Sequence, residues 1–384
     1  MKNQFLVFVL GILIISCDSK IFELKDNNLI GVNFSNNLKF NDDFNVYKYR
    51  NFYNGGGVAL GDINNDDLLD IYLTSNQGEN KLFLNLGDFK FKDITEFASV
   101  GGEKAWSTGV TMVDINGDGY LDIYVCNSGD VEGDNKQNEL FINSGDLTFK
   151  ESALEYNLND KGFSTHANFF DYDKDGDLDV YILNNSFQAI GSFDLRRNER
   201  PKRDVLGGDK LMQNNNGYFN DVSESAGIYG SVIGFGLGIT IGDIDGDNWD
   251  DIFISNDFFE RDYLYLNQKN GTFKEDLTNR MNSISGASMG ADIADIDNNG
   301  TNDIFVTEML PSDYKRLKSV TTFEGWDKYK YNVKNGYHHQ FTRNVLHLNI
   351  ENNKFSEIGR FSGLEASDWS WGALFFDFDN DGLK

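Results

Sequence analysis

Short apolar runs alternate with polar, turn-rich segments along almost the whole chain, and the same order of segments recurs. Residues 109–127 (GVTMVDINGDGYLDIYVCN) show the unit, in which a carboxylate-rich loop separates two apolar runs. Runs such as LDIYV are rich in aromatic and β-branched residues, which favour strands. Two further apolar runs around an Asn or Gly turn follow in each unit and predict a β-hairpin. These hairpins span residues 81–95, 139–152, 210–223, 263–278 and 344–358.

Each unit therefore predicts four antiparallel strands. Repeated four-stranded sheets with a period of about 40 to 80 residues are typical of an all-β fold, the β-propeller, with one sheet per blade. A glycine five residues before the acidic loop, at Gly57, Gly109, Gly238, Gly290 and Gly372, indicates close backbone approach round a central axis; His166 is the exception. The predicted blades lie near residues 51–99, 100–156, 157–227, 228–283 and 284–363, and 364–384 begins the next. We expect the chain to be an incomplete propeller, with five blades and the start of a sixth.

The acidic loops point to a hard cation. Side-chain oxygens stand at loop positions 1, 3, 5 and 9, and a backbone carbonyl is expected from position 7; this set suits Ca²⁺ better than Mg²⁺, at about one ion per blade. The predicted ligands are Asp62, Asn64, Asp66, Leu68 and Asp70; Asp114, Asn116, Asp118, Tyr120 and Asp122; Asp171, Asp173, Asp175, Asp177 and Asp179; Asp243, Asp245, Asp247, Trp249 and Asp251; Asp295, Asp297, Asn299, Thr301 and Asp303; and Asp377, Asp379 and Asp381.

An EF-hand is the alternative for such loops. It requires a Glu at position 12 and flanking helices, whereas position 12 here is apolar and lies in a predicted strand: Leu73, Val125, Ile182, Ile254 and Val306. Asp67 and Asn248 replace the Gly at position 6. We expect the fully acidic third and fourth loops to bind Ca²⁺ most tightly and the fifth, with Asn299, most weakly, because affinity follows ligand charge.

Charge and the N-terminal residues restrict the functional classes. With 61 acidic and 34 basic residues, the net charge of −27 argues against nucleic acid as a partner. Lys2 and the apolar run 5–15 predict a signal peptide. Ile14-Ile15-Ser16-Cys17 resembles the lipobox of bacterial lipoproteins, which implies an exported protein, lipid-anchored to a membrane or cell surface through Cys17; a plain signal peptide is the alternative. Residues 1–17 are then signal peptide and lipobox, 18–50 a tether and a first strand leading into the repeats, and 51–384 the propeller.

The repeat itself resembles a known family. D-x-[DN]-x-D-G-x-x-D between strands, with G-x-x-x-x-D ahead of it, is similar to the FG-GAP or VCBS repeats of integrin α-chain propellers. GVALGDINNDDLLDIYLTSNQGENKLFLN, NGYHHQFTRNVLHLN and WSWGALFFDFDNDG resemble the ASPIC/UnbV group, the relatives of cartilage acidic protein. This resemblance implies a calcium-loaded extracellular propeller.

Two long connections, residues 185–208 and 308–343, are predicted at the face opposite the acidic loops, and we call them the first and second inserts. They concentrate basic and aromatic side chains on an acidic protein, which favours a protein or glycan ligand at the cell surface. The candidate ligand-binding residues are Arg196, Arg197, Arg200, Trp326, Tyr337, His338, His339 and Arg343. A binding or adhesion module is thus the first interpretation. The alternative is a carbohydrate-active enzyme resembling a polysaccharide lyase, with its base among the residues of the second insert.

Overall fold

The fold is all-β, as predicted. The computed structural model describes residues 22–103, 106–128, 137–186, 188, 194, 196–320, 325–350 and 354–384. Within these ranges the chain forms five antiparallel sheets of four strands each, and in every sheet the strands lie in chain order. The five predicted hairpins form the third and fourth strands of these sheets. Each sheet is a blade of the expected propeller.

The strands of the first three blades are β1 (Val58–Gly61), β2 (Asp70–Leu73), β3 (Lys81–Asn85) and β4 (Phe91–Asp93); β5 (Ser107–Val113), β6 (Asp122–Asn127), β7 (Glu139–Asn143) and β8 (Phe149–Glu151); and β9 (Ser164–Phe170), β10 (Asp179–Asn184), β11 (Lys210–Asn214) and β12 (Phe219–Asp221). Those of the last two are β13 (Gly236–Gly242), β14 (Asp251–Asn256), β15 (Tyr263–Asn267) and β16 (Phe273–Glu275); and β18 (Ala291–Ala294), β19 (Asp303–Val306), β21 (Val345–Ile350) and β22 (Lys354–Glu357). A one-turn helix follows each of the first four blades: α2 (Thr95–Ala98), α3 (Ala153–Tyr156), α4 (Ser223–Ala226) and α5 (Leu277–Arg280).

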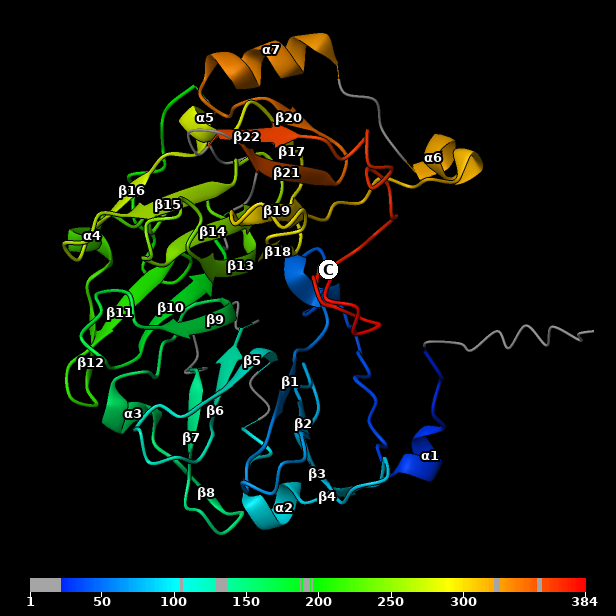
Figure 1. The fold of residues 1–384 in the computed structure, drawn as a ribbon, viewed down its shortest axis with the longest axis vertical. Coiled ribbons are helices and arrows are strands. Elements are labelled where there is room, and N and C mark those ends of the chain that lie inside the picture. The colour runs from blue at the N-terminus through cyan, green and yellow to red at the C-terminus, as the bar shows by residue number, and fades with distance from the viewer. Residues whose placement is uncertain are drawn as a thin grey trace, which may run out of the picture.

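The first strands of successive blades lie side by side, so the blades fan around a common axis (Figure 1). Glycine makes this approach possible. A Cβ at Gly57 would lie 2.7 Å from the carbonyl oxygen of Thr108 and 3.0 Å from the Cα of Gly109, and one at Gly290 would lie 2.7 Å from the carbonyl oxygen of Trp371. The close approach inferred from the fixed glycine position is therefore present between blades, and it extends to the C-terminal residues.

The core is divided into layers between neighbouring blades. One layer packs Tyr72 and Leu82 of the first blade against Ile123 and Val125 of the second, and equivalent layers lie between each later pair. The second strands supply much of this packing, because every residue of β6, β10 and β14 is buried. Stability of this kind is a sum of nearest-neighbour interfaces.

Residues 22–57 differ from the predicted tether and first strand. The described part holds the short helix α1 (Asn27–Ile30) and the 3₁₀ helix η1 (Arg50–Tyr53), and no strand before β1. We call residues 36–57 the N-terminal strap. Phe44, Tyr49 and Phe52 of the strap pack on Trp106 of the second blade. Polar, Asn-rich sequence without alternation accounts for the lack of a strand, and burial of these aromatic rings holds the strap in place.

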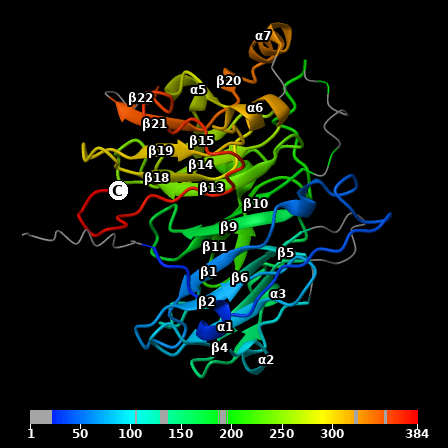
Figure 2. The same ribbon diagram turned by 90° about the vertical axis from the view of Figure 1, so that its right-hand side faces the viewer.

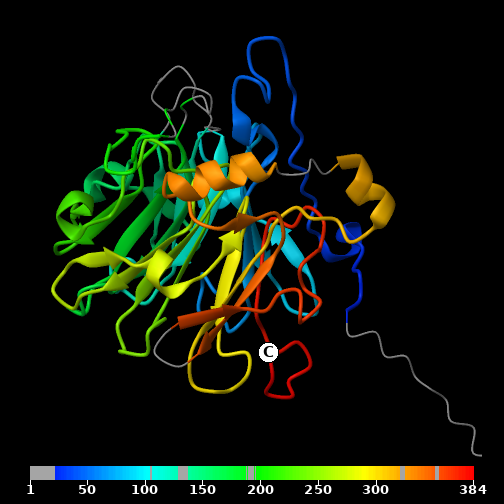
Figure 3. The same ribbon diagram turned by 90° about the horizontal axis from the view of Figure 1, so that it is seen from above.

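The segment 364–384 runs beside β18 without regular strand pairing (Figure 2). Phe375 donates its backbone N–H to Asp292, at 2.5 Å. The second insert contains α6 (Tyr314–Val320), α7 (Trp326–Lys334) and β20 (Gln340–Phe341), and β20 pairs in parallel with β17 (Ile284–Ser285). Strap and α7 lie at one face and the acidic loop between β18 and β19 at the other (Figure 3). No helix in the described ranges combines the length and apolar character needed to cross a bilayer.

Candidate metal loops and the insert face

All six acidic loops have the same internal hydrogen bonds. In the loop between β5 and β6, the Asp114 carboxylate accepts the N–H groups of Asp118, at 3.1 Å, and Gly119, at 2.8 Å. The carboxylate at position 5 in turn accepts the N–H of position 7, as Asp118 does from Tyr120 at 2.9 Å. Equivalent bonds recur in the other five loops. The spacing of side-chain oxygens therefore fixes one loop shape, and in the five blades strands rather than long helices flank it.

The backbone of the loops is also uniform. Positions 4 and 6 are left-handed in each, and position 6 is Gly in four of the six loops. Asp67 and Asn248 adopt the same conformation, with φ of 67° and 66°. Asn tolerates this region better than most residues. The two departures from glycine therefore leave the loop shape unchanged.

In the five blades, the Asp at position 9 is the buried end of the loop. Asp122 is fully buried, and its two oxygens accept the N–H groups of Ile115, at 3.1 Å, and Asn143, at 2.8 Å. Burial raises the pKa of Asp122 to about 6, that of Asp251 to about 7 and that of Asp179 to about 8, and nearby loop carboxylates add to the rise. Negative charge is thus held where water solvates it poorly, which a bound cation would compensate.

The oxygens converge as a cation site requires. Carboxylate oxygens lie within 4.8 Å of one another in four groups: Asp171, Asp173 and Asp179; Asp243, Asp245 and Asp251; Asp295, Asp297 and Asp303; and Asp377, Asp379 and Asp381. The first two loops have Asn64 and Asn116 at position 3. The Oδ1 atoms of Asn64 and Asp173 are buried and accept no hydrogen bond from the described residues. Unpaired buried oxygens at position 3 and an oxygen-only donor set fit a hard divalent cation.

Arg200 joins the first insert to the fourth blade and to the second insert. Nε of Arg200, in the first insert, lies 2.6 Å from Oε1 of Glu260, and both side chains are buried. The guanidinium also donates to the carbonyl of Gly336, at 3.0 Å, and lies over the ring of Tyr337, 5.0 Å from its centroid. Tyr337 is only 1% exposed. These two candidate ligand residues therefore join the inserts to the fourth blade instead of facing solvent.

The other candidate ligand residues have separate partners or are exposed. Arg196 and Arg197 are exposed and pair with Asp194. Trp326 is 66% exposed on α7. The structure assigns separate partners to the remaining three: His338 bonds to the carbonyl of Met281 at 2.9 Å, His339 to the hydroxyl of Tyr329 at 2.6 Å, and Arg343 pairs with Glu357.

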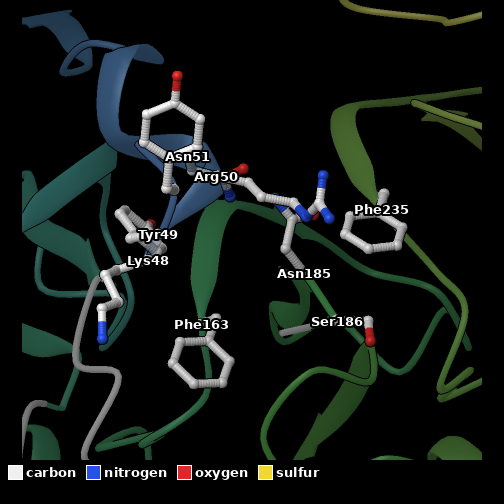
Figure 4. Close-up of a pocket in the computed structure, with 9 residues that line it drawn as sticks. Lys48, Tyr49, Arg50, Asn51, Phe163, Asn185, Ser186 and Phe235 are labelled. Carbon is white, nitrogen blue, oxygen red and sulfur yellow. The ribbon is translucent and has the colours of Figure 1, made fainter. Parts of the chain in front are cut away.

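Sequence reasoning missed two cavities near the axis on the insert face. The larger, of about 810 Å³, lies among the strap, the second insert and the tryptophans at 369 and 371. The smaller, of about 170 Å³, lies between the strap and blades three and four (Figure 4). One feature of the sequence could have indicated these cavities. The residue six positions after loop position 9 is polar in four blades, where it is Asn76, Ser128, Asn185 or Asp257.

Comparisons with known proteins agree with this architecture. The profile of the FG-GAP-like repeat matches residues 62–125, 128–182 and 243–306. Cartilage acidic protein 1 of Xenopus tropicalis is 29% identical over 210 residues, which are 54% of this chain and 29% of the relative. The human protein of that name is 28% identical over 205 residues, 53% of this chain and 28% of the relative. The chain thus matches less than a third of the length of these relatives.

Similarities to solved structures are distant. A lectin of Agrocybe aegerita, described for its recognition of non-reducing terminal N-acetylglucosamine, has a TM-score of 0.41 and 16% identity over 78% of this chain and 64% of its own. The V. cholerae biofilm matrix protein Bap1 has a TM-score of 0.36 and 13% identity over 66% of this chain and 34% of its own.

Proposed function

Because the chain is an FG-GAP-repeat protein related to cartilage acidic protein 1, we propose that it is an exported, calcium-stabilised propeller that acts as a binding module for a protein or glycan at the cell surface. The observation that carries this proposal is the sixfold recurrence of one acidic loop, with carboxylate oxygens that converge in four of the six copies. Recurrence in every blade favours a structural ion over a catalytic one, because a catalytic centre needs one site and not six.

Positions 1, 3, 5 and 9 of each loop would hold the ion, with the backbone carbonyl of position 7. When bound, Ca²⁺ supplies a cross-link between the first two strands of a blade and neutralises the carboxylates. Position 9 connects this cross-link to the third strand, since Asp122 also accepts the N–H of Asn143. A disulfide does not cross-link the described residues, because Cys126 is buried and has no disulfide partner among them.

Export and anchoring belong to the same proposal. The apolar run 5–15 and Cys17 lie outside the described residues, and the lipid anchor on Cys17 rests on their sequence alone. The net charge of −27 supports a partner other than nucleic acid.

The insert face is the proposed binding surface. The buried Arg200 and Glu260 pair fixes the first insert on the fourth blade, and Arg200 also donates to Gly336 of the second insert. Exposed Arg196, Arg197 and Trp326 project from the inserts. Exposed guanidinium and indole groups on a rigid base are typical of recognition surfaces.

The lyase alternative receives less support. Tyr337 is buried, and burial raises the pKa of its hydroxyl to about 12, which makes it a poor general base. Arg343 is engaged by Glu357. In the described part of the second insert, each of these candidates has a separate partner.

Two measurements on the intact chain test the proposal. Calorimetric titration of the metal-free protein with CaCl₂ should show several equivalents bound. A glycan and protein ligand screen should then give binding that requires Ca²⁺. Binding of no calcium would overturn the metal assignment, and acidic polysaccharide converted to products absorbing at about 235 nm would replace the binding module by an enzyme.

A further inference from the structure

The smaller axial cavity is lined by residues from three separate parts of the chain. The strap supplies residues 47–51, blade three supplies Phe163, Asn185 and Ser186, and blade four supplies Phe235. Its volume of about 170 Å³ equals that of roughly six waters at about 30 Å³ each. This is smaller than the cavities of about 300 Å³ and more that enclose drug-sized ligands. A single sugar ring, and not an oligosaccharide, matches the space.

Asn185 is the unusual group in this cavity. Its side chain is 3% exposed, yet neither Oδ1 nor Nδ2 has a hydrogen-bond partner among the described residues. Its backbone is fixed, because its N–H donates to the carbonyl of Phe163 at 3.0 Å and it forms a bridge with Phe235. Buried amides are nearly always paired on both atoms. An adjacent donor and acceptor left unpaired at a fixed position form a built recognition element.

The preceding blades provide an internal control. Asn76, at the equivalent position of blade one, donates to the carbonyl of Gly55 at 2.8 Å and accepts from Asn36 at 2.7 Å. Ser128, in blade two, bonds to the hydroxyl of Tyr49 at 2.7 Å. The strap thus satisfies the equivalent side chain in two blades. At blade three it passes over Asn185 without bonding to its side chain and leaves a cavity instead.

Arg50 gives the cavity its charge. No hydrogen bond or ion pair engages its guanidinium within the described ranges, and it lies over the ring of Phe258, 5.3 Å from the centroid. Figure 4 shows Arg50 reaching from the strap toward Phe235, with Asn185 below it. Lys48 is a second cation in the lining, and none of the lining residues is acidic. Asp257 lies near Arg50 outside this cavity. An unused guanidinium fork favours a planar carboxylate.

We propose that this cavity binds a uronic acid at the end of a glycan chain. The carboxylate would pair with Arg50, vicinal hydroxyls would use the open donor and acceptor of Asn185, and Phe163 and Phe235 would face the apolar side of the ring. The inference rests on the proposed function as a binding module and adds the class of ligand and the place where it binds.

Titration calorimetry of the full chain in excess Ca²⁺ tests this site, with D-galacturonate and D-glucuronate as probes and D-galactose as the neutral control. We expect a uronate to bind with a dissociation constant in the millimolar range and galactose to bind at least fivefold more weakly. Asn185→Leu, which keeps the volume and removes both polar atoms, should weaken uronate binding at least tenfold. Arg50→Gln should remove the preference for uronate over galactose, whereas Arg360→Gln, a matched exchange at an exposed site on the last described blade, should change neither.

Melting curves identify a folding defect in Asn185→Leu. If that variant unfolds, Arg50→Gln decides the question, since Arg50 is exposed and its guanidinium has no hydrogen-bond or ion-pair partner among the described residues. Absence of uronate binding would overturn the inference and leave water as the occupant. Equal uronate binding by wild type and Arg50→Gln would also overturn it, because uronate would then bind elsewhere on the chain. If the intact chain still binds another ligand in the screen, the proposed function as a binding module stands although the uronate site fails. The failure of the inference and the failure of the proposed function are therefore distinguishable.

Discussion

The two faces of the propeller are built by opposite rules. On the loop face, six loops repeat the same hydrogen bonds within nine residues of chain, and even Asp67 and Asn248 adopt the conformation of the glycines they replace. On the insert face, the contacts that differ between blades join distant residues: Arg200 meets Glu260 and Gly336, and the strap crosses three blades. Repetition serves stability, because every blade needs the same cross-link, and variation serves recognition, because one ligand needs one unique surface.

Removal of calcium should produce the largest effect, because it acts on the whole loop face at once. Each site saturated at about a hundredfold its dissociation constant contributes about 2.7 kcal/mol. We expect EGTA to lower the melting temperature, measured by scanning calorimetry, by about 10 °C or more. Added CaCl₂ should restore it, and MgCl₂ should restore less. A melting temperature unaffected by chelation would contradict the role of calcium on the loop face, and with it the physical distinction between the two faces.

Arg200→Ala tests the insert face at its buried junction. The change leaves the Glu260 carboxylate, whose pKa burial already raises, without its cation. Loss of one partner of a buried pair costs about 3 to 5 kcal/mol, so chemical denaturation should show a large loss in the free energy of unfolding. Arg196→Ala, at an exposed arginine of the same insert, should change it by less than about 0.5 kcal/mol. Equal losses in the free energy of unfolding for the two substitutions would show that the Arg200–Glu260 pair does not hold this junction.

Asp173→Asn tests a single loop with a natural precedent, since Asn64 and Asn116 occupy the same position in the first two loops. Removing one charge from the third loop should weaken calcium there several-fold and lower the melting temperature by a few degrees in Ca²⁺. The difference from wild type should disappear in EGTA. A difference that persists without calcium would assign Asp173 to loop folding and not to metal binding.

Asp262→Asn should give the smallest effect and the only stabilising one. Asp262 is fully buried, and its oxygens accept from the N–H of Asn256, at 2.8 Å, and the hydroxyl of Ser288, at 2.9 Å. Blade one has Asn80 in this place, with Ser107 as the equivalent hydroxyl partner at 3.1 Å. Burial raises the pKa of Asp262 to about 7. An asparagine can therefore accept from the backbone N–H and donate to the hydroxyl, as Asn80 does, without a charge.

The sign of the pH dependence follows from that shift. The ordinary carboxyl pKa in the unfolded chain is about 3.9, so ionisation opposes folding increasingly from about pH 4 and fully above about pH 7. Asp262→Asn removes this penalty and should raise the free energy of unfolding at pH 8, by on the order of 1 kcal/mol, with a much smaller gain at pH 5. Arg261 and Glu260 shift the same pKa in opposite directions, and both remain in the variant. A larger gain at pH 5 than at pH 8 would contradict the assignment.

The sequence determined the loop face because its geometry is local. Alternate carboxylates, a left-handed position and an apolar strand on each side all lie within a dozen residues, so six copies could be located, their strands paired and the glycines placed at blade contacts. Only the tertiary structure decided the insert face. Arg200 and Tyr337 carry the composition of a ligand site, yet chain folding buries them against Glu260. Asn185 carries no distinguishing motif, yet the path of the strap leaves its amide open, because hydrogen bonds across more than a hundred residues depend on how blades and strap come together.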